Sequence, residues 1–416
     1  MKILVLGSGA REHAIVKALV RTGTPAANVV CAPGNAGIAQ DVTCVALNAN
    51  DPAAVVAFAT ENQFDLAIIG PEAPLVAGVS DALRNAGIAV FGPSQKAAAL
   101  EGSKSFAKEI MAAADVPTGM ARECTTIGQV EEALDDFGAP YVVKADGLAA
   151  GKGVIVTSDR DAALEHARKF IDMGILVEEF LAGQEVSLFF LADGKNVLPL
   201  TPAQDFKRAF DNDEGPNTGG MGAYSPLPWL PAGFVEEVQR TVAQPTVDEM
   251  ARLGEPFVGL LYCGLIVTER GIRVIEFNAR FGDPETQVVL RRLVTPLAGL
   301  LHAAATGNLA NAPEPVFTSD VAITVVLASE GYPDTAAPNR PIHGLHKAAE
   351  VEGVEICHAA TAQDGDHLVA TGGRVLSVVA SGKDFHHARK HAYEAIEHIK
   401  LEGSHFRKDI AKKVAN

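Results

Sequence analysis

Strand-length apolar runs alternate with helical patterns over the first hundred residues. The predicted strands are residues 2–6, 28–32, 66–69 and 89–91, and the predicted helices are residues 11–21, 51–62 and 79–86. Strands that are apolar on both faces and alternate with helices are typical of a parallel sheet covered on both sides. The pattern therefore predicts an N-terminal doubly wound parallel-sheet α/β domain.

The alternation changes at two places further along the chain. A helix is predicted to begin at Lys104, and two strand-length apolar runs joined by a glycine-rich loop follow it. From Phe317 onward, strands at 321–327 and 374–380 precede a helix at 385–399. We predict three domains: an N-terminal α/β domain at 1–101, a central domain at 102–316 with a mobile lid subdomain at about 118–188, and a C-terminal α+β domain at 317–416.

Composition excludes several classes of function. The chain has 416 residues, of which 48% are hydrophobic, but its apolar runs fall well short of the roughly 20 residues that a membrane helix needs. Its net charge of −16 disfavours nucleic acid, which is bound through basic surfaces. The five cysteines lack C-x-x-C spacing, which indicates reduced thiols and argues against zinc or a disulfide framework. We expect a cytoplasmic protein without nucleic-acid or membrane partners.

The segment from Val274 to Glu285 carries the first chemical signal. The period of two along a strand places Glu276, Asn278 and Arg280 on one face. A carboxylate beside a carboxamide oxygen suits Mg²⁺, which takes hard oxygen ligands and completes its shell with water and phosphates. The arginine adds a planar fork for a phosphate or carboxylate. Taken alone, the segment also fits a solvated strand edge followed by a helix.

A glycine-rich loop upstream gives a second phosphate signal. Glycines at positions 147, 151 and 153 lie between two apolar runs, so the backbone N–H groups of a hairpin could close over phosphates, with Lys152 near its tip. A Walker A loop would need a glycine in place of Asp146 and Ser or Thr in place of Gly153. A glycine-rich hairpin with a solvated lysine is the alternative.

The first loop, Gly7-Ser-Gly-Ala-Arg-Glu-His13, begins like a dinucleotide fingerprint. Glu12 stands at the third glycine position, and the loop after the second predicted strand has no acidic residue for a ribose hydroxyl. A nicotinamide cofactor is therefore not expected, although a smaller phosphate could still bind this loop. We predict that His13 has a structural role or supports other site residues, rather than acting as a catalyst.

Taken in order, these motifs resemble the ATP-grasp superfamily, with a lysine strand, a glycine-rich lid, an acidic hinge at 178–181 and an E-x-N-x-R strand. Within that superfamily the chain resembles the phosphoribosylamine–glycine ligase family. The matching segments are residues 11–13, 32–37, 70–75, 100–104, 144–153, 215–225, 278–285 and 407–410. The match runs nearly from end to end, and this order of motifs is highly specific.

The resemblance implies an ATP-dependent carbon–nitrogen ligase of de novo purine biosynthesis. Such an enzyme joins glycine to 5-phospho-β-D-ribosylamine through a glycyl phosphate, and it releases the glycinamide ribonucleotide, ADP and phosphate. ATP is then the co-substrate, and Mg²⁺ or Mn²⁺ is the expected metal. We expect a monomer whose partners are these small molecules.

The resemblance also implies roles for individual residues. The expected metal ligands are Glu276 and Asn278. The expected ATP-binding residues are Lys104, Lys144, Gly151, Lys152, Gly153, Glu178, Glu179, Phe180, Leu181 and Glu185. The expected substrate-binding residues are Gly9, Asn35, Asp205, Arg208, Gly220 and Arg280, and the expected catalytic residues are Arg280, Lys207 and Lys152.

Some of these roles have alternatives. Arg280 could make only a structural ion pair, and the acidic hinge could be a surface loop. Asp283 and Glu285 could serve the site or cap the following helix.

Two other functions remain open at this point. Another ATP-grasp ligase, such as a biotin-carboxylase-like enzyme, would share the nucleotide machinery but not the N-terminal and C-terminal motifs. A nucleotide-sensing or NAD-binding module without catalysis would explain the first hundred residues, but it would leave the polar face at 276–280 unused.

Overall fold

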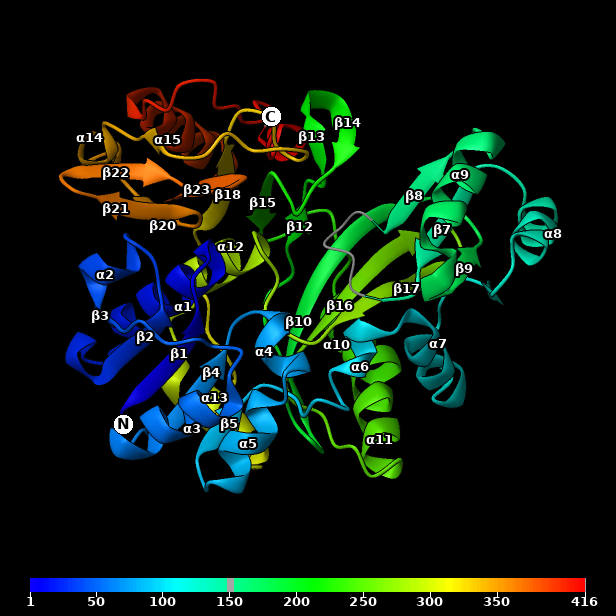
Figure 1. Ribbon diagram of the computed structural model, residues 1–416, viewed down its shortest axis with the longest axis horizontal. Coiled ribbons are helices and arrows are strands. Elements are labelled where there is room, and N and C mark those ends of the chain that lie inside the picture. Colours follow the sequence, from blue (N-terminus) through cyan, green and yellow to red (C-terminus); the bar gives the residue numbers. More distant parts are fainter. Residues whose placement is uncertain (148–152, 416) are drawn as a thin grey trace.

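The structure is a computed structural model that describes residues 1–147 and 153–415 (Figure 1). Its N-terminal part is a parallel sheet in the order β3-β2-β1-β4-β5. The strands are β1 (Ile3–Gly7), β2 (Val29–Pro33), β3 (Thr43–Cys44), β4 (Leu66–Ile69) and β5 (Ala89–Phe91). The strand order reverses beside β1, and ligands of such sheets bind in the crevice at the carboxyl ends of the strands there.

Helices cover both faces of this sheet. In β1, Leu4 and Leu6 share a hydrophobic core with α3 and α5, whereas Ile3 and Val5 share a second core with α1 and α13. The helices of this part are α1 (Ala10–Arg21), α2 (Ile38–Asp41), α3 (Pro52–Glu61), α4 (Glu72–Val76), α5 (Val79–Asn85) and, from further along the chain, α13 (Leu297–Ala305). The predicted doubly wound arrangement is confirmed. One covering helix comes from outside residues 1–101.

The central part contains two antiparallel four-stranded sheets. The first, in the order β11-β10-β16-β17, consists of β10 (Gln184–Asp193), β11 (Val197–Pro199), β16 (Val258–Thr268) and β17 (Gly271–Asn278). The second, in the order β6-β9-β7-β8, consists of β6 (Ala121–Cys124), β7 (Tyr141–Ala145), β8 (Val154–Thr157) and β9 (Ile175–Glu178). Helices α6 (Ala99–Gly102), α7 (Lys104–Ala113), α10 (Phe234–Val238) and α11 (Gln244–Arg252) surround them, whereas α12 (Glu285–Arg292) packs mainly against α1 and the C-terminal sheet.

The second of these sheets lies within the predicted lid subdomain. Helices α8 (Ile127–Phe137) and α9 (Arg160–Phe170) pack on it and share a separate hydrophobic core with it. Figure 1 shows this unit projecting from the rest of the molecule. The predicted pairing of β7 with β8 is confirmed. The predicted residues Gly151 and Lys152 lie outside the described part of the chain.

The C-terminal sheet draws strands from two of the predicted domains. Its order is β12-β15-β18-β23-β20. The strands are β12 (Gln204–Asp205), β15 (Gly222–Ser225), β18 (Val321–Ala328), β20 (Val354–His358) and β23 (Arg374–Gly382), with α15 (Phe385–His398) packed on β18 and β23. Nearby lie the hairpin of β13 (Arg208–Phe210) and β14 (Glu214–Asn217), the helix α14 (Leu345–Ala349) and the small sheet of β19 (Arg340–Pro341), β21 (Thr361–Asp364) and β22 (His367–Ala370). The sheet therefore continues across the predicted boundary at residue 316.

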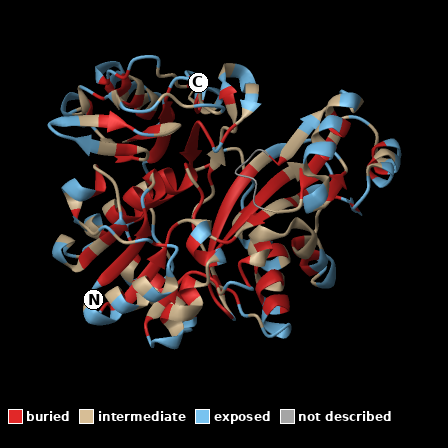
Figure 2. Ribbon diagram, in the orientation of Figure 1, coloured by how far each residue is buried: buried red, intermediate tan, exposed pale blue. Residues whose placement is uncertain are grey.

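Burial follows these sheets. The central strands of each layer are buried, and exposed residues gather on the outer helices and loops (Figure 2). In the part of the chain that the structure describes, no helix is long and apolar enough to cross a membrane.

A buried histidine pair joins the N-terminal and C-terminal parts. His13, which is 1% exposed, lies 2.9 Å from the Asp41 carboxylate, and its Nδ1 accepts the backbone N–H of His358 at 2.8 Å. Lys17 forms an ion pair with the same carboxylate at 2.9 Å. The prediction that His13 is structural agrees with this position.

The histidine pair predicts loss of stability in acid. Burial, with the charges of His13 and Lys17, lowers the pKa of His358 from 6.5 to about 3. The unfolded chain therefore binds an extra proton between these values, and stability falls as the pH drops from about 6.5 toward 3, by at most about 1.4 kcal/mol per pH unit from this residue. We expect His358→Gln to flatten this dependence in denaturant titrations at pH 7, 6 and 5. The exposed His346→Gln is the control, and equal pH dependence in both variants would contradict the assignment.

Candidate active site

Lys144 connects the lid sheet to the strand that carries the predicted metal ligands. Its Nζ lies 3.0 Å from Glu178 Oε2 and donates to the Ile275 carbonyl at 3.3 Å. Both side chains of the ion pair are buried. Lys108 lies 3.7 Å from the same carboxylate. Two lysines from different elements are thus fixed beside β17.

Asp146 ties the base of the glycine-rich loop to the start of α7. Its carboxylate accepts the Lys104 N–H at 2.5 Å and the Ser105 hydroxyl at 2.7 Å. The Lys104 ammonium donates to the carbonyls of Ala145 and Gly147 at 2.8 and 3.0 Å. Burial lowers the pKa of Lys104, against the opposing charge of Glu276. Lys104 is therefore held at the point where the loop leaves β7.

Glu276 and Asn278 lie on one face of β17, as predicted. Both are half-buried, and they alternate with the buried Phe277 and Ala279. Burial alone would raise the pKa of Glu276, but the charges of Lys207, Lys144 and Lys104 outweigh it and lower the pKa. The carboxylate is therefore ionised at neutral pH.

The oxygen atoms of Glu276 and Asn278 suit a hard divalent cation. Within residues 1–147 and 153–415, no three His, Cys, Asp or Glu side chains form a group that could hold a metal ion. An ionised carboxylate beside a carboxamide still suits Mg²⁺, because Mg²⁺ is usually held by one or two protein oxygens plus water and substrate phosphates.

Arg280 lies two residues beyond the end of β17, outside the strand whose period of two was expected to place it beside Glu276 and Asn278, and it points to two glutamates. Its guanidinium lies 2.9 Å from Glu101 and 3.3 Å from Glu72, and Glu101 also accepts the Ala279 N–H at 2.8 Å. The structural ion pair considered as an alternative is therefore present. It fixes the guanidinium without excluding a further contact to a substrate.

Lys207 lies in an acidic setting. Its ammonium is 2.8 Å from Glu185 Oε2, and its side chain is 38% exposed. Burial would lower the pKa of Lys207, but Glu185, Asp205 and Glu276 raise it well above its usual value. Burial and the neighbouring acids Glu285, Glu185 and Glu276 raise the pKa of Asp205 to about 8, although Lys207 opposes them. The predicted residues Asp205, Lys207 and Glu185 thus belong to one charge cluster, which Glu276 adjoins.

The predicted hinge connects β9 to β10. The Glu179 N–H donates to the Met120 carbonyl at 3.0 Å, and the Glu179 carboxylate accepts the Met120 N–H and pairs with Arg270. Phe180 is 44% exposed, and Leu181 is half-buried. The hinge is therefore partly fixed by its own side chains and leaves an aromatic ring exposed.

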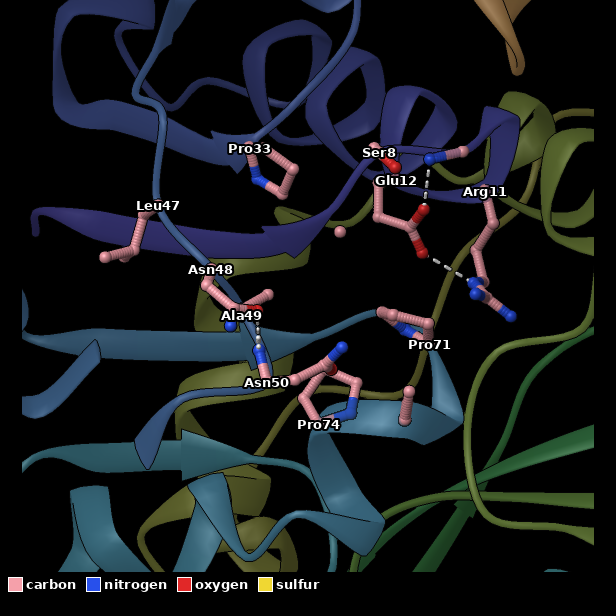
Figure 3. Close-up of a pocket in the computed structure, with 13 residues that line it drawn as sticks. Ser8, Arg11, Glu12, Pro33, Leu47, Asn48, Ala49, Asn50, Pro71 and Pro74 are labelled. Atoms are coloured by element: carbon pink, nitrogen blue, oxygen red, sulfur yellow. Dashed lines mark hydrogen bonds and ion pairs between the residues drawn. The ribbon is translucent and has the colours of Figure 1, made fainter. Parts of the chain in front are cut away.

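The Glu12 side chain occupies the space within the loop at residues 7–13, where a dinucleotide-binding loop has its third glycine. Its carboxylate accepts the Gly9 N–H and the Arg11 Nε–H, both at 2.6 Å (Figure 3). A Cβ on Gly70 would lie 2.1 Å from Glu12 Oε1, and one on Gly7 would lie 2.5 Å from its Cγ, so the carboxylate fits only beside glycines. A negative side chain therefore occupies the helix N-terminus where a phosphate would otherwise bind.

Two cavities border this loop. One, of about 400 Å³, lies at the carboxyl ends of β1 and β2 and includes Ser8, Gly9, Arg11, Asn48, Asn50 and Pro74 in its lining (Figure 3). The other, of about 440 Å³, includes Gly9, Asn35, Asp283, Thr361 and Arg374. The predicted residue Gly9 lines both. The second cavity is built from all three parts of the chain.

Asn35 holds that second cavity together through its side chain. Its amide donates to the carbonyls of Ser8 and His358, both at 2.8 Å, and its Oδ1 accepts the N–H groups of Gly37 and Ile38. The side chain therefore links the first loop to the C-terminal sheet.

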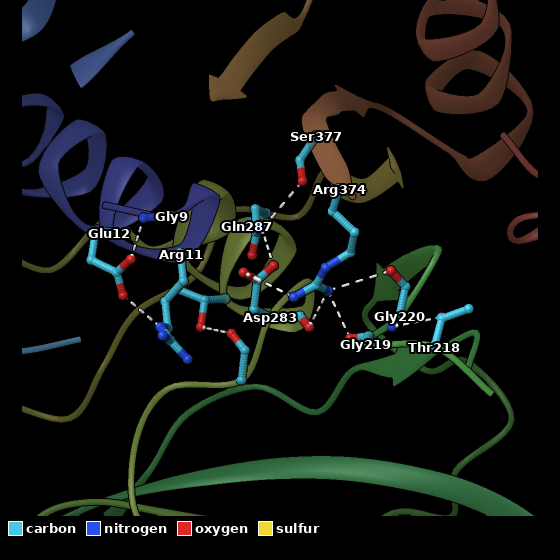
Figure 4. Close-up of polar contacts among 12 residues, drawn as sticks. Gly9, Arg11, Glu12, Thr218, Gly219, Gly220, Asp283, Gln287, Arg374 and Ser377 are labelled. Carbon is cyan, nitrogen blue, oxygen red and sulfur yellow. Dashed lines mark hydrogen bonds and ion pairs between the residues drawn. The ribbon is translucent and has the colours of Figure 1, made fainter. Parts of the chain in front are cut away.

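Arg374 is a charged residue of this region that the sequence did not single out. Its guanidinium donates to the carbonyls of Gly219 and Asp283 at 2.7 and 2.8 Å and lies 3.4 Å from the Asp283 carboxylate (Figure 4). The predicted residue Gly220 is buried beside it, with its N–H donating to Thr218. Arg374 stands at the start of a predicted strand, and nothing in the local sequence indicated that its guanidinium would contact residues of the central part.

The alternative that Asp283 or Glu285 caps α12 is wrong. Pro284 is the N-cap residue, and it makes no side-chain capping bond. Glu285 instead accepts from Tyr262 at 2.8 Å and from Ser187 at 3.1 Å, because these buried hydroxyls need an acceptor. Asp283 accepts from the Gln287 side chain at 2.8 Å.

Two antiparallel sheets that carry these lysines and acids, beside an N-terminal parallel sheet, define an ATP-grasp enzyme. Three models of the phosphoribosylglycinamide synthetase family match the chain: the N domain at 1–101, the ATP-grasp (A) domain at 102–286 and the C domain at 322–413. The chain belongs to this family. It is a carbon–nitrogen ligase of purine biosynthesis, which confirms the predicted family, fold class and enzyme class.

Individual relatives agree. The phosphoribosylamine–glycine ligase of Leifsonia xyli subsp. xyli is 64% identical over 417 residues, covering 99% of each chain. The crystal structure of a phosphoribosylamine–glycine ligase from Thermotoga maritima has a TM-score of 0.85 and 31% identity, and the match covers 99% of this chain and 100% of that one. The biotin carboxylase domain of Hydrogenobacter thermophilus 2-oxoglutarate carboxylase, at 17% identity and a TM-score of 0.69, covers 97% of this chain and 91% of that one. That last likeness is one of fold alone.

Proposed function

We propose that this protein joins glycine to 5-phospho-β-D-ribosylamine with ATP, through a glycyl phosphate. The observation that carries the proposal is the convergence of Lys104 on α7, Lys144 on β7 and Lys207 between β12 and β13 around Glu276 on β17, whose pKa their charges lower. Phosphoryl transfer depends mainly on positioning and on neutralising charge, and this is what such a constellation supplies. The names of the relatives give the substrates.

In the first step a glycine carboxylate oxygen bonds to the γ-phosphorus of ATP, and the bond from that phosphorus to ADP breaks. Lys104, Lys144 and Lys152 hold the phosphates of ATP, with the N–H groups of Gly151 and Gly153. Glu276 and Asn278 would hold Mg²⁺ or Mn²⁺, which when bound neutralises phosphate charge. This step turns a poor acyl donor into one with a good leaving group.

In the second step the amine nitrogen of the ribosylamine attacks the carbonyl carbon of glycyl phosphate. The bond from carbon to the phosphate oxygen breaks, phosphate leaves, and the nitrogen loses a proton. Arg280 and Lys207 stabilise the negative charge on the acyl phosphate, and Asp205, Arg208 and Gly220 border the glycine side. The fixed ion pairs of Arg280 support this role, because they hold the guanidinium in one orientation.

The remaining assignments concern the adenosine part of ATP and the phosphoribosyl group of the ribosylamine. The backbone of 178–181 reads adenine, with Glu185 accepting from the ribose of ATP after release from Lys207. The phosphoribosyl group occupies the cavities at Gly9 and Asn35, which lie at the carboxyl end of the parallel sheet. The domain boundaries at 101 and 316, a monomeric state and a cytoplasmic location complete the proposal.

The decisive measurement is ADP release with ATP and Mg²⁺ in the presence of glycine, phosphoribosylamine, or both. We expect release only when both co-substrates are present, together with formation of the glycinamide ribonucleotide by mass spectrometry. Release that requires bicarbonate instead would indicate a carboxylase-like activity. ATP binding without release under any of these conditions would indicate a nucleotide-binding module.

A further inference from the structure

The C-terminal motif Arg407-Lys-Asp-Ile410 has a completely buried arginine. The Arg407 side chain is 0% exposed, although it carries a positive charge. It forms ion pairs with Asp213 at 2.9 Å and with Asp409 at 2.7 Å. A buried charge is retained only where it is paired and hydrogen-bonded, so these contacts fix the guanidinium in one place.

From that place the guanidinium contacts the residues on both sides of Lys207. It stacks on the ring of Phe206, 4.9 Å from the ring centroid, and it donates to the Arg208 carbonyl at 3.1 Å. Both contacts are with the short segment that carries the Lys207 ammonium toward Glu185. In the part of the chain that the structure describes, Arg407 forms no hydrogen bond or ion pair with Lys207 itself.

The glycine-rich motif at 217–222 is hydrogen-bonded to the same segment. The Thr218 N–H and hydroxyl both donate to the Lys207 carbonyl, at 2.8 and 2.9 Å, and the Met221 N–H donates to the Phe206 carbonyl at 2.8 Å. Ile410 packs against Gly222, where a Cβ would lie 2.6 Å from its Cδ1. The two motifs are thus in contact with each other, and both contact the segment at 206–208.

We propose that Arg407 is a positioning residue for the ligase reaction, which acts by holding the backbone at 206–208 so that the Lys207 ammonium keeps its place, paired with Glu185 until ATP binds. The inference rests on the proposed role of Lys207 at the acyl phosphate. It assigns to the C-terminal part of the chain an influence on the phosphoryl-transfer site that acts through the backbone at 206–208. A displacement of about 1 Å in a positioning element can cost about a hundredfold in rate.

Two variants of Arg407 and one control test this proposal. Arg407→Gln removes the charge and the fork, whereas Arg407→Lys keeps the charge but cannot contact Phe206, Arg208 and both aspartates at once. Arg389→Gln is the matched control, because Arg389 donates to the carbonyls of Lys408 and Ile410 and stacks on Tyr393. Arg389 therefore holds the same tail, and among residues 1–147 and 153–415 it forms no hydrogen bond or ion pair with the segment at 206–208.

Two readouts separate positioning from general stability. The first is kcat/KM for glycine, which we expect to fall about 10- to 100-fold in the Arg407 variants and to stay near the parent value in Arg389→Gln. The second is acetylation of Lys207 in the intact protein, followed by peptide mass spectrometry and normalised to the exposed Lys96. Lys207 should react faster when its segment is released from Glu185.

The outcomes are distinct. Faster acetylation and lower kcat/KM in either Arg407 variant, at a melting temperature no lower than that of Arg389→Gln, support the proposal. Equal acetylation and equal kcat/KM in Arg407→Lys and Arg389→Gln overturn it, even if Arg407→Gln does not fold. Acetylation needs no substrate, so failure of the proposed function, seen as absence of ligase activity in the parent protein, is recognised separately.

Discussion

Replacing Glu276 with alanine is expected to lower metal-dependent ADP release by about a thousandfold or more. The variant loses one of the two oxygen ligands expected for the metal, and it leaves Lys207, Lys144 and Lys104 without the carboxylate whose pKa they lower. The loss should appear in kcat and should not be recovered at high ATP. Rates measured over a Mg²⁺ titration, with both co-substrates present, check this result.

The matched control for that variant is Glu269→Ala. Glu269 is an exposed acid in the turn between β16 and β17, on the same hairpin as Glu276. The control should keep the parent rate and the parent dependence on Mg²⁺. Turnover of Glu276→Ala at the parent rate would show that the metal is held elsewhere.

Replacing Lys144 with methionine is expected to weaken both the fold and ATP binding. The change leaves the Glu178 carboxylate buried, with Lys108 at 3.7 Å as its remaining ion-pair partner in the described structure. Removing one partner of a buried ion pair typically costs about 3–5 kcal/mol of unfolding free energy. Denaturant unfolding and calorimetric titration with ATP in the presence of Mg²⁺ measure the two effects separately.

A second substitution distinguishes the structural role of Lys144 from its role toward ATP. Lys144→Met with Glu178→Leu replaces the whole buried pair by apolar side chains, which is often neutral for stability. The double variant should regain stability but not ATP binding, whereas the exposed Lys169→Met should change unfolding by less than about 1 kcal/mol. Recovery of ATP binding in the double variant would remove Lys144 from the nucleotide site.

Local sequence was sufficient for the parts of this fold that depend on neighbouring residues. The apolar runs give β1, β4 and β5 with nearly the observed bounds, and the period of two places Glu276 and Asn278 on one face of β17. Glycine-rich loops and lysines predicted a phosphate-binding site. The order of motifs then indicated the family.

Contacts between distant segments could not be predicted from local patterns. Arg280 pairs with Glu72, 208 positions away, and Asn35 donates to the carbonyl of His358, 323 positions away. The departure from the dinucleotide fingerprint at Glu12 was visible in the sequence. Its physical reason, a carboxylate that fits against Gly7 and Gly70, needs the folded loop.

The pairing of β15 with β18 also limits where recombination can divide the gene without disrupting the fold. Residues 204–205 and 222–225 form two strands of a sheet whose other three strands follow residue 320. A recombination event between them would leave two unpaired strand edges, which tend to aggregate. Selection is therefore expected to keep the segments that carry β15 and β18 in one gene.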